Sequence, residues 1–201
     1  MKYYQDITII PCAEISIYHI WEKLYQQVHL ALVESQGAED KIHMGVAFPK
    51  YKYNEKCKTL GNVLRVFANS EQELENLDLT KWLTRLSDYA HIKSIRTVPE
   101  TNSFYSFYDP RPESNIERLA RRNIKRLKEK RNIKITLEEA IKKIKARGFK
   151  EEKLDYPFIN VKSLGNQHRF RRFIIQQKAD IMTNKGFNSY GLSRQSSLPN
   201  F

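Results

Sequence analysis

The chain has 201 residues, enough for one domain of ordinary size or two small ones that share an interface. Its formal net charge of +12 favours an anionic partner, which leaves nucleic acid, an acidic membrane and an acidic protein as the candidates. The cysteines, Cys12 and Cys57, are too few and too far apart for a disulfide framework or a zinc site. Asp6 interrupts the short apolar run at the N-terminus, so we expect a cytoplasmic protein with neither a signal peptide nor a membrane span.

The positive charge is concentrated in one half of the sequence. Residues 1–99 contain 12 Lys or Arg against 12 Asp or Glu, whereas residues 100–201 contain 23 against 11. This asymmetry predicts a neutral folded platform followed by a lobe that binds a polyanion. The alternative is a basic surface that is merely solvated.

Residues 1–68 show one predicted helix among predicted strands. Residues 3–10 alternate in polarity and favour a strand, and residues 14–35 have an apolar stripe at helical spacing. Two further strands are expected at 42–48 and 62–68. The connection between them, 50–58, is rich in Tyr and Lys and is expected to form a surface hairpin.

A second helix and a fourth strand complete this platform. Ser70 and Glu73 form a capping box at the start of an apolar helical pattern with a break near Leu79. Residues 92–98 then favour a strand. The resulting order, βαββαβ, predicts a ferredoxin-like domain over residues 1–99, and many RNA-binding modules have this plan.

Residues 100–113 differ from the platform because they contain two prolines and four aromatic residues without a clear period. We expect them to be a linker. The remaining residues, 114–201, then form a smaller, basic α+β domain, and the whole chain belongs to the α+β class.

An arginine-rich helix is expected over residues 115–131, where Ser114 and Glu117 form a capping box. At helical spacing one side is apolar, and the opposite side carries Arg118, Arg121, Arg122, Lys125, Arg126 and Lys128. Guanidinium groups pair with phosphates and with guanine edges, so this face matches the groove of an RNA hairpin. Calmodulin targets and membrane-surface helices are the alternatives. Thr136 and Glu139 predict a second helix that ends at Gly148 and packs beside the first.

Two positions in the chain carry side chains suited to RNA chemistry. His29 lies away from the apolar stripe of its helix, and an exposed imidazole can accept a proton from a ribose 2′-hydroxyl at neutral pH. Phe170 shares one strand face with His168 and Arg172 and can stack on a base. The alternatives are an ordinary surface histidine and a phenylalanine packed in the core. By themselves Ser163 and Tyr190 indicate nothing.

Six short motifs occur in an order that resembles one family. They are VHLAL with His29, GVAFP, SNIERLARR, YPFINVKS with Ser163, HRF with Phe170, and SYGLS with Tyr190. Over nearly its whole length the chain resembles the type I-F CRISPR-associated endoribonuclease, which cuts the repeat RNA of the CRISPR precursor. The resemblance implies a ferredoxin-like domain, a smaller C-terminal domain, and an arginine-rich helix in the major groove of a repeat hairpin.

The resemblance also implies a mechanism at the base of that hairpin. His29 would deprotonate the 2′-hydroxyl, Ser163 would fix that ribose, and Tyr190 would hold the histidine in place. The expected products carry a 2′,3′-cyclic phosphate and a 5′-hydroxyl. The sequence contains no cluster of closely spaced carboxylates, no His-x-His and no Cys-x-x-Cys, so we expect neither a metal nor another cofactor.

The resemblance assigns RNA contacts as well. Arg122, Lys125 and Arg126 match the family's phosphate and groove contacts, and Phe170 matches the aromatic residue that stacks under the last base pair. Helical spacing adds Arg118 and Arg121. Where the family has a base-reading arginine and glutamine, this chain reads DPRPE, which leaves Arg111 as the candidate.

Its expected partners follow from the same resemblance. They are the repeat hairpin, in precursor and mature guide RNA, and the other subunits of the type I-F surveillance complex. The free protein is expected to be monomeric, and no membrane partner is expected. Two alternatives stay open: a hairpin-binding subunit that does not cut, and a protein that binds double-stranded DNA.

Overall fold

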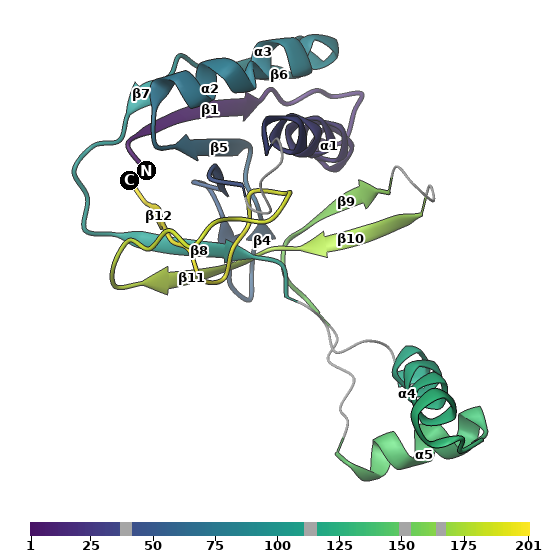
Figure 1. Ribbon diagram of the computed structural model, residues 1–201. Coiled ribbons are helices and arrows are strands. Elements are labelled where there is room, and N and C mark those ends of the chain that lie inside the picture. The colour runs from purple at the N-terminus through teal and green to yellow at the C-terminus, as the bar shows by residue number, and fades with distance from the viewer. Residues whose placement is uncertain (37–41, 111–115, 149–153, 164–167) are drawn as a thin grey trace. The chain divides into compact units, whose positions relative to one another are not determined.

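The computed structural model describes residues 1–36, 42–110, 116–148, 154–163 and 168–201. The chain forms two compact units. The first unit contains Met1–Asp109 and Tyr156–Phe201, and the second unit contains Pro110–Asp155 (Figure 1). The secondary structure mixes helices and strands, as expected for the α+β class.

The main sheet of the first unit has the order β2-β5-β1-β6, and β7 pairs with the other end of β1. Its strands are β1 (Tyr3–Ile9), β2 (Gly45–Ala47), β5 (Val63–Ala68), β6 (Ala90–Ile92) and β7 (Arg96–Thr97). All neighbouring strands are antiparallel. The strand expected at 92–98 is therefore two short strands, both paired with β1.

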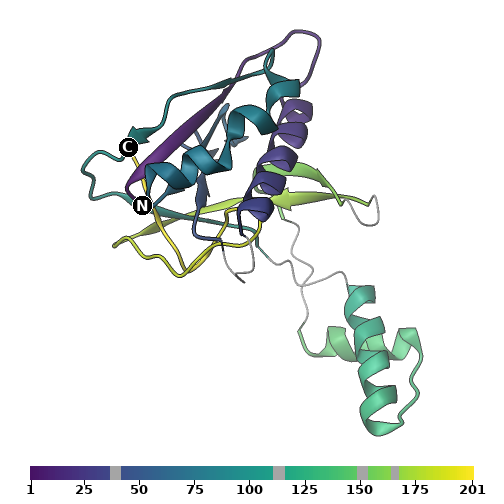
Figure 2. The same ribbon diagram turned by 45° about the horizontal axis from the view of Figure 1, so that its top comes forward.

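Helices cover one face of this sheet. Figure 2 shows α1 (Ile17–Gln36) and α2 (Glu71–Leu77) on the same face, followed by α3 (Leu79–Trp82) and the 3₁₀ turn η1 (Thr84–Leu86). The expected capping box is present at the start of α2, because the Ser70 and Glu73 side chains each accept a hydrogen bond from the other residue's backbone N–H. The expected break is present too, at Asp78, whose φ is 43°.

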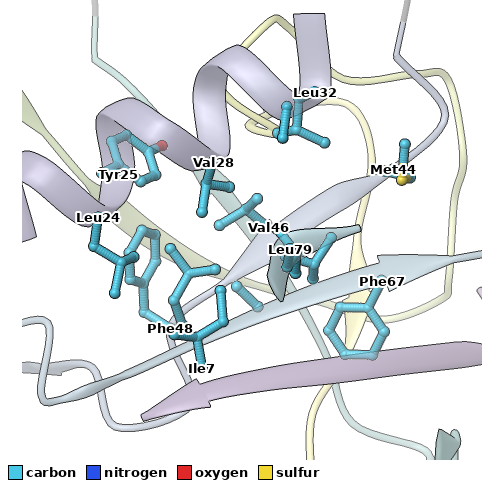
Figure 3. Packing of buried hydrophobic residues seen from close by; sticks show 14 of the residues in the cluster. Ile7, Leu24, Tyr25, Val28, Leu32, Met44, Val46, Phe48, Phe67 and Leu79 are labelled. Carbon is cyan, nitrogen blue, oxygen red and sulfur yellow. The ribbon is translucent and has the colours of Figure 1, made fainter. Parts of the chain in front are cut away.

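The hydrophobic core lies between α1 and the sheet. Figure 3 shows Leu24 and Val28 of α1 pointing toward Phe48 and Ile7 of β1, with Leu32 further along the same side of the helix, and all five side chains are 0% exposed. Residues on a strand alternate between its two faces. Ile7 and its partner on β5, Leu64, therefore face the helices, while Asp6 faces the other side of the sheet. His29 follows Val28 directly, which places it at the margin of this core.

A buried ion pair occupies the opposite face of the sheet. Nε of Arg65 donates to Oδ1 of Asp6 at 2.7 Å, and Nη2 donates to Oδ2 at 3.0 Å. The guanidinium lies 4.1 Å from the ring centre of Phe201 and 4.4 Å from that of Tyr4. The C-terminal residue therefore covers the charge that the sheet buries.

Residues 100–113 are not simply a linker, because they contain β8 (Phe104–Tyr108). This strand lies at the centre of a second sheet, between β11 (Ile175–Ala179) and β12 (Leu198–Pro199). The Phe and Tyr residues that looked aperiodic form a strand because they pair with segments about 70 to 90 residues away in the chain, at Ile175–Ala179 and Leu198–Pro199.

Two hairpins complete the first unit. The surface hairpin expected at 50–58 is present as β3 (Lys52–Tyr53) and β4 (Lys58–Thr59). The second hairpin consists of β9 (Phe158–Lys162) and β10 (Arg169–Phe173), and β9 packs against α1.

The expected division at 1–99, 100–113 and 114–201 differs from the two units observed. The reason is hydrophobic: Ile159, Ile174, Phe187, Leu192 and Leu198 belong to the same core cluster as the residues of α1 and β1. Residues 156–201 therefore complete the N-terminal fold, and only the helical part is separate from it.

The second unit contains α4 (Ile116–Arg131) and α5 (Leu137–Ala146), which pack against each other. Thr136 and Glu139 form the expected capping box of α5, and Gly148 follows this helix with a φ of 82°. The capping box expected at Ser114 and Glu117 lies partly outside the described residues. Within the described ranges, no helix is long and apolar enough to cross a membrane.

Candidate functional site

His29 lies on α1 and is half-buried, which agrees with the partial exposure expected from its helical angle away from the apolar stripe. Its Nδ1 atom lies 2.6 Å from the carbonyl oxygen of Ser189. A carbonyl oxygen can only accept, so Nδ1 carries the hydrogen and donates it. The neutral imidazole then has its lone pair on Nε2, and this is the nitrogen that can accept a proton from a substrate.

A tight turn holds Ser189 and Tyr190 in place. The Asn188 side chain accepts hydrogen bonds from the backbone N–H groups of Tyr190, at 2.9 Å, and Leu192, at 3.1 Å. Gly191 has a φ of 71°, and its carbonyl oxygen accepts from the backbone N–H of Val46 at 2.7 Å. A Cβ atom at Gly191 would overlap the Val46 side chain, so glycine is needed for both the turn and its contact with the main sheet.

Three planar groups are stacked at this turn. The rings of His29 and Tyr190 are nearly parallel, at 4°, with their centres 3.8 Å apart. The central guanidinium carbon of Arg172 lies 3.7 Å from the centre of the Tyr190 ring. Two planar groups this close to one ring centre would overlap if they shared a face. Arg172 and His29 therefore lie on opposite faces of Tyr190.

Hydrogen bonds hold each member of the stack: His29 through Ser189, Arg172 through Asp109, and the backbone of Tyr190 through Tyr25. Nη1 of Arg172 donates to a carboxylate oxygen of Asp109 at 2.5 Å. The hydroxyl of Tyr25, four residues before His29 on α1, donates to the carbonyl oxygen of Tyr190 at 3.1 Å. Sequence reasoning missed Tyr25, Asp109 and the role of Arg172. The spacing of Tyr25 from His29 was a usable signal, since residues four apart on a helix are neighbours.

The environment lowers the pKa of His29 below its ordinary value of 6.5. The main cause is burial, which disfavours the charged imidazolium, and the positive charge of Arg172 acts in the same direction. The hydrogen bond to Ser189 opposes them. His29 is therefore more fully neutral at pH 7 than a solvated histidine, which is the state that a general base requires.

Ser163 and Phe170 lie on the β9–β10 hairpin beside α1. Ser163 directly follows β9, and its backbone N–H donates to the carbonyl oxygen of His168 at 2.9 Å. Phe170 is partly buried and packs against the core cluster. The Arg169 guanidinium pairs with the buried Glu22 carboxylate of α1 at 3.6 Å. The hairpin is thus held against α1, but the described contacts of Ser163 do not include His29.

The basic residues expected to contact RNA lie on the second unit. Those on α4 are all exposed: Arg118, Arg121, Arg122, Lys125 and Arg126. Arg121 and Lys125 form salt bridges within the helix at 3.8 and 3.9 Å, and such exposed pairs are weak enough to exchange for phosphate. Arg111 lies outside the described residues.

Three arginines line a groove between α4 and α5. The groove has a volume of about 400 Å³. Arg122 and Arg126 of α4 face it together with Arg147, which follows α5. Ala120 and Ala140 are fully buried, which allows the two helices to approach closely. The second unit thus presents an exposed basic helix face with a basic groove beside it.

Comparison with known proteins assigns the chain to a family. The family model described as "CRISPR-associated protein (Cas_Csy4)" matches residues 4–201. The chain belongs to the Cas_Csy4 family. Two relatives are each named "CRISPR-associated endonuclease Cas6/Csy4". The protein from Escherichia coli (strain UTI89 / UPEC) is 31% identical over 204 residues, and that from Pseudomonas aeruginosa (strain UCBPP-PA14) is 31% identical over 202 residues.

Both alignments cover 100% of this chain and 100% of the relative. The family resemblance expected from the six motifs is therefore confirmed over the whole Cas_Csy4 chain, including the helical unit. Among the described residues of this family member, no three His, Cys, Asp or Glu side chains are grouped so as to hold a metal ion.

Proposed function

We propose that this protein is a metal-independent endoribonuclease that binds a CRISPR repeat hairpin and cuts precursor CRISPR RNA at the base of the stem. The observation that carries the proposal is the hydrogen bond from His29 Nδ1 to the Ser189 carbonyl, which directs the basic lone pair to Nε2. Family membership, with relatives named as CRISPR-associated endonucleases, supplies the reaction class. The strand order β2-β5-β1-β6 supports the ferredoxin-like plan for the N-terminal part.

In this mechanism His29 is the general base. Its Nε2 takes the proton of the 2′-hydroxyl as the 2′-oxygen attacks the adjacent phosphorus. The bond from phosphorus to the 5′-oxygen breaks, and that oxygen takes up a proton. The products are a 2′,3′-cyclic phosphate and a 5′-hydroxyl. Ser163 holds the attacked ribose, and alignment of the 2′-oxygen with the phosphorus supplies several kcal/mol of the barrier reduction.

Tyr190 and Arg172 are positioning residues in this mechanism. Tyr190 stacks flat against His29 and prevents the imidazole from rotating about its side-chain bonds. Arg172, which Asp109 holds by a hydrogen bond, covers the other face of Tyr190 and keeps its ring parallel to the imidazole. Preorganisation of this kind matters because a misplaced base loses most of its catalytic effect.

The second unit would hold the hairpin itself. The exposed face of α4, with Arg118, Arg121, Arg122, Lys125 and Arg126, would contact the phosphates and base edges of the stem. Phe170 would stack under the last base pair. This dense positive charge favours slow product release, so the protein would stay bound to the guide RNA. In this proposal the protein is a monomer in the cytoplasm when free. With its guide RNA it would join the other subunits of a type I-F surveillance complex.

The test is single-turnover cleavage of the cognate repeat hairpin in excess EDTA. We expect the wild-type protein to cut and His29→Ala to lose about 10²- to 10⁴-fold in rate while binding changes only a few-fold. His19→Ala is the matched control, because His19 is an exposed histidine on the same helix, and it should cut normally. Equal rates for His29→Ala and wild type would remove the proposed base, and intact RNA with all three proteins would indicate a hairpin-binding subunit that does not cut.

A further inference from the structure

The β3–β4 hairpin has a composition that the proposed function does not use. Lys50, Lys52, Lys56 and Lys58 surround its turn and are all exposed, and Glu55 is its only acidic residue. Four lysines and one glutamate within nine residues make a local excess of positive charge, which attracts a polyanion.

Two tyrosines make an aromatic platform on this hairpin. The rings of Tyr53 and Tyr156 lie 4.7 Å apart at an angle of 31°, and Lys58 Nζ lies 6.0 Å from the Tyr53 ring centre. Tyr53 nevertheless remains 48% exposed. An aromatic ring held by a neighbour, yet open to solvent and surrounded by lysines, has the features of a stacking site for an unpaired base.

The platform is joined to the β9–β10 hairpin. Tyr156 stands two residues before β9, and the Tyr51 hydroxyl donates to the carbonyl oxygen of Ile174, directly after β10, at 3.0 Å. Ser163 follows the other end of β9. At about 3.3 Å per residue, the strand separates the platform from Ser163 by roughly 20 Å.

The face of the β9–β10 hairpin opposite the core, its outer face, connects these two ends. Helix α1 borders this face, because Arg169 pairs with Glu22 at 3.6 Å and the Phe158 ring stacks on Tyr18 with the ring centres 6.2 Å apart. Lys162 pairs with Arg169, and Asn160 pairs with Arg171, so these four side chains share one face, opposite the buried Ile159. Arg169 and Arg171 are exposed. Further along this face, the Arg171 guanidinium lies 4.6 Å from the ring centre of Phe158, which contacts Phe173 at 5.7 Å. Positive groups and aromatic rings thus follow each other from Ser163 to Tyr53.

We propose that this surface, from the outer face of the β9–β10 hairpin to the Tyr53–Tyr156 platform, binds the single-stranded RNA that flanks the stem of the repeat hairpin. The inference rests on the proposed function, because the flank begins at the stem base, where Ser163 would hold the ribose. Stacking favours RNA over an acidic protein segment, and it favours unpaired RNA over duplex, whose bases are already stacked.

The test compares three uncleavable RNAs with a 2′-deoxy sugar at the cut site: the bare hairpin, and hairpins with about six unpaired nucleotides on the 5′ or the 3′ side. For the wild type we expect one flank to raise the affinity by about 5- to 150-fold, the range for one stacked base, and the two arms identify which flank binds. Tyr53→Leu should lose most of this gain without altering affinity for the bare hairpin. Tyr53→Phe, which keeps the ring, should retain it.

Equal affinity of the wild type for bare and flanked hairpins would overturn the inference. If the wild type still cleaved a bare hairpin with a normal 2′-hydroxyl, the proposed function would stand even though the flank-binding surface had been disproved. Equal weakening of all three RNAs by Tyr53→Leu would also overturn it, because that result indicates a general structural effect. If the wild type bound no hairpin, the proposed function would fail. In that case, binding of an unstructured twelve-nucleotide RNA tests the single-strand surface by itself. Its affinity must fall in Tyr53→Leu and stay unchanged in Lys178→Ala, a control at an exposed residue.

Discussion

Replacing Arg172 separates its two contributions to the site. Arg172→Met keeps most of the side-chain length but removes the charge that pairs with Asp109 and stacks on Tyr190. Loss of one partner from a fully buried pair costs about 3 to 5 kcal/mol, but the Asp109 side chain is 30% exposed and stays partly hydrated, so about 1 to 2 kcal/mol is expected. The lost cation–π contact adds about 1 kcal/mol. We expect urea unfolding to show a loss of about 2 to 3 kcal/mol.

The same substitution should move the pH dependence of cleavage. The positive charge of Arg172 lowers the pKa of His29, so removing the charge raises that pKa. Cleavage needs the neutral imidazole, so the midpoint at which the rate rises with pH should shift to higher pH in Arg172→Met. The assay is single-turnover cleavage at saturating protein between about pH 5 and pH 9.

Arg172→Lys provides the control, because it keeps the charge and loses the planar stacking group. Its midpoint should stay near that of the wild type even though its stability falls. A midpoint in Arg172→Met that does not move, or that moves to lower pH, would refute the electrostatic coupling between Arg172 and His29.

Two further predictions concern the turn and the helical unit. Gly191→Ala should cost about 2 to 4 kcal/mol in urea unfolding, because alanine is strained at a φ of 71° and overlaps Val46, whereas Ser193→Ala should cost less than half of that. Equal losses would contradict the need for glycine. Arg122→Ala should weaken hairpin binding and reduce the slope of log affinity against log salt by about 0.9, the value for one lost phosphate contact. An unchanged slope would mean that Arg122 does not contact phosphate.

The elements with local signals were predictable from the sequence. The apolar stripe of residues 14–35 predicted α1, and the capping boxes at Ser70 and Thr136 predicted the starts of α2 and α5. The partial exposure of His29 followed from its angle on α1. These signals depend on residues a few positions apart, which is why a single sequence contains them.

The features that failed depend on contacts far apart in the sequence. Residues 104–108 form a strand only because 175–179 and 198–199 pair with them. The anchoring of Tyr190 by Arg172 and Asp109 joins three segments with no shared pattern. The expected roles of Ser163, Phe170 and the basic residues of α4 stay predictions, because they depend on an RNA that the free chain does not contain.

The insertion of the second unit within the first has a consequence for synthesis on the ribosome. The core of the first unit includes Leu192 and Leu198, so this unit cannot finish folding when Asp109 has emerged. At about 5 to 20 residues per second, translation from Asp109 to Leu198 takes roughly 4 to 18 seconds. During that interval α4 and α5 can form and pack against each other, because their contacts are local. The apolar core residues of β1 and α1 stay partly uncovered until the last strands are synthesised. These uncovered residues are the part of the nascent chain most exposed to aggregation or to a chaperone.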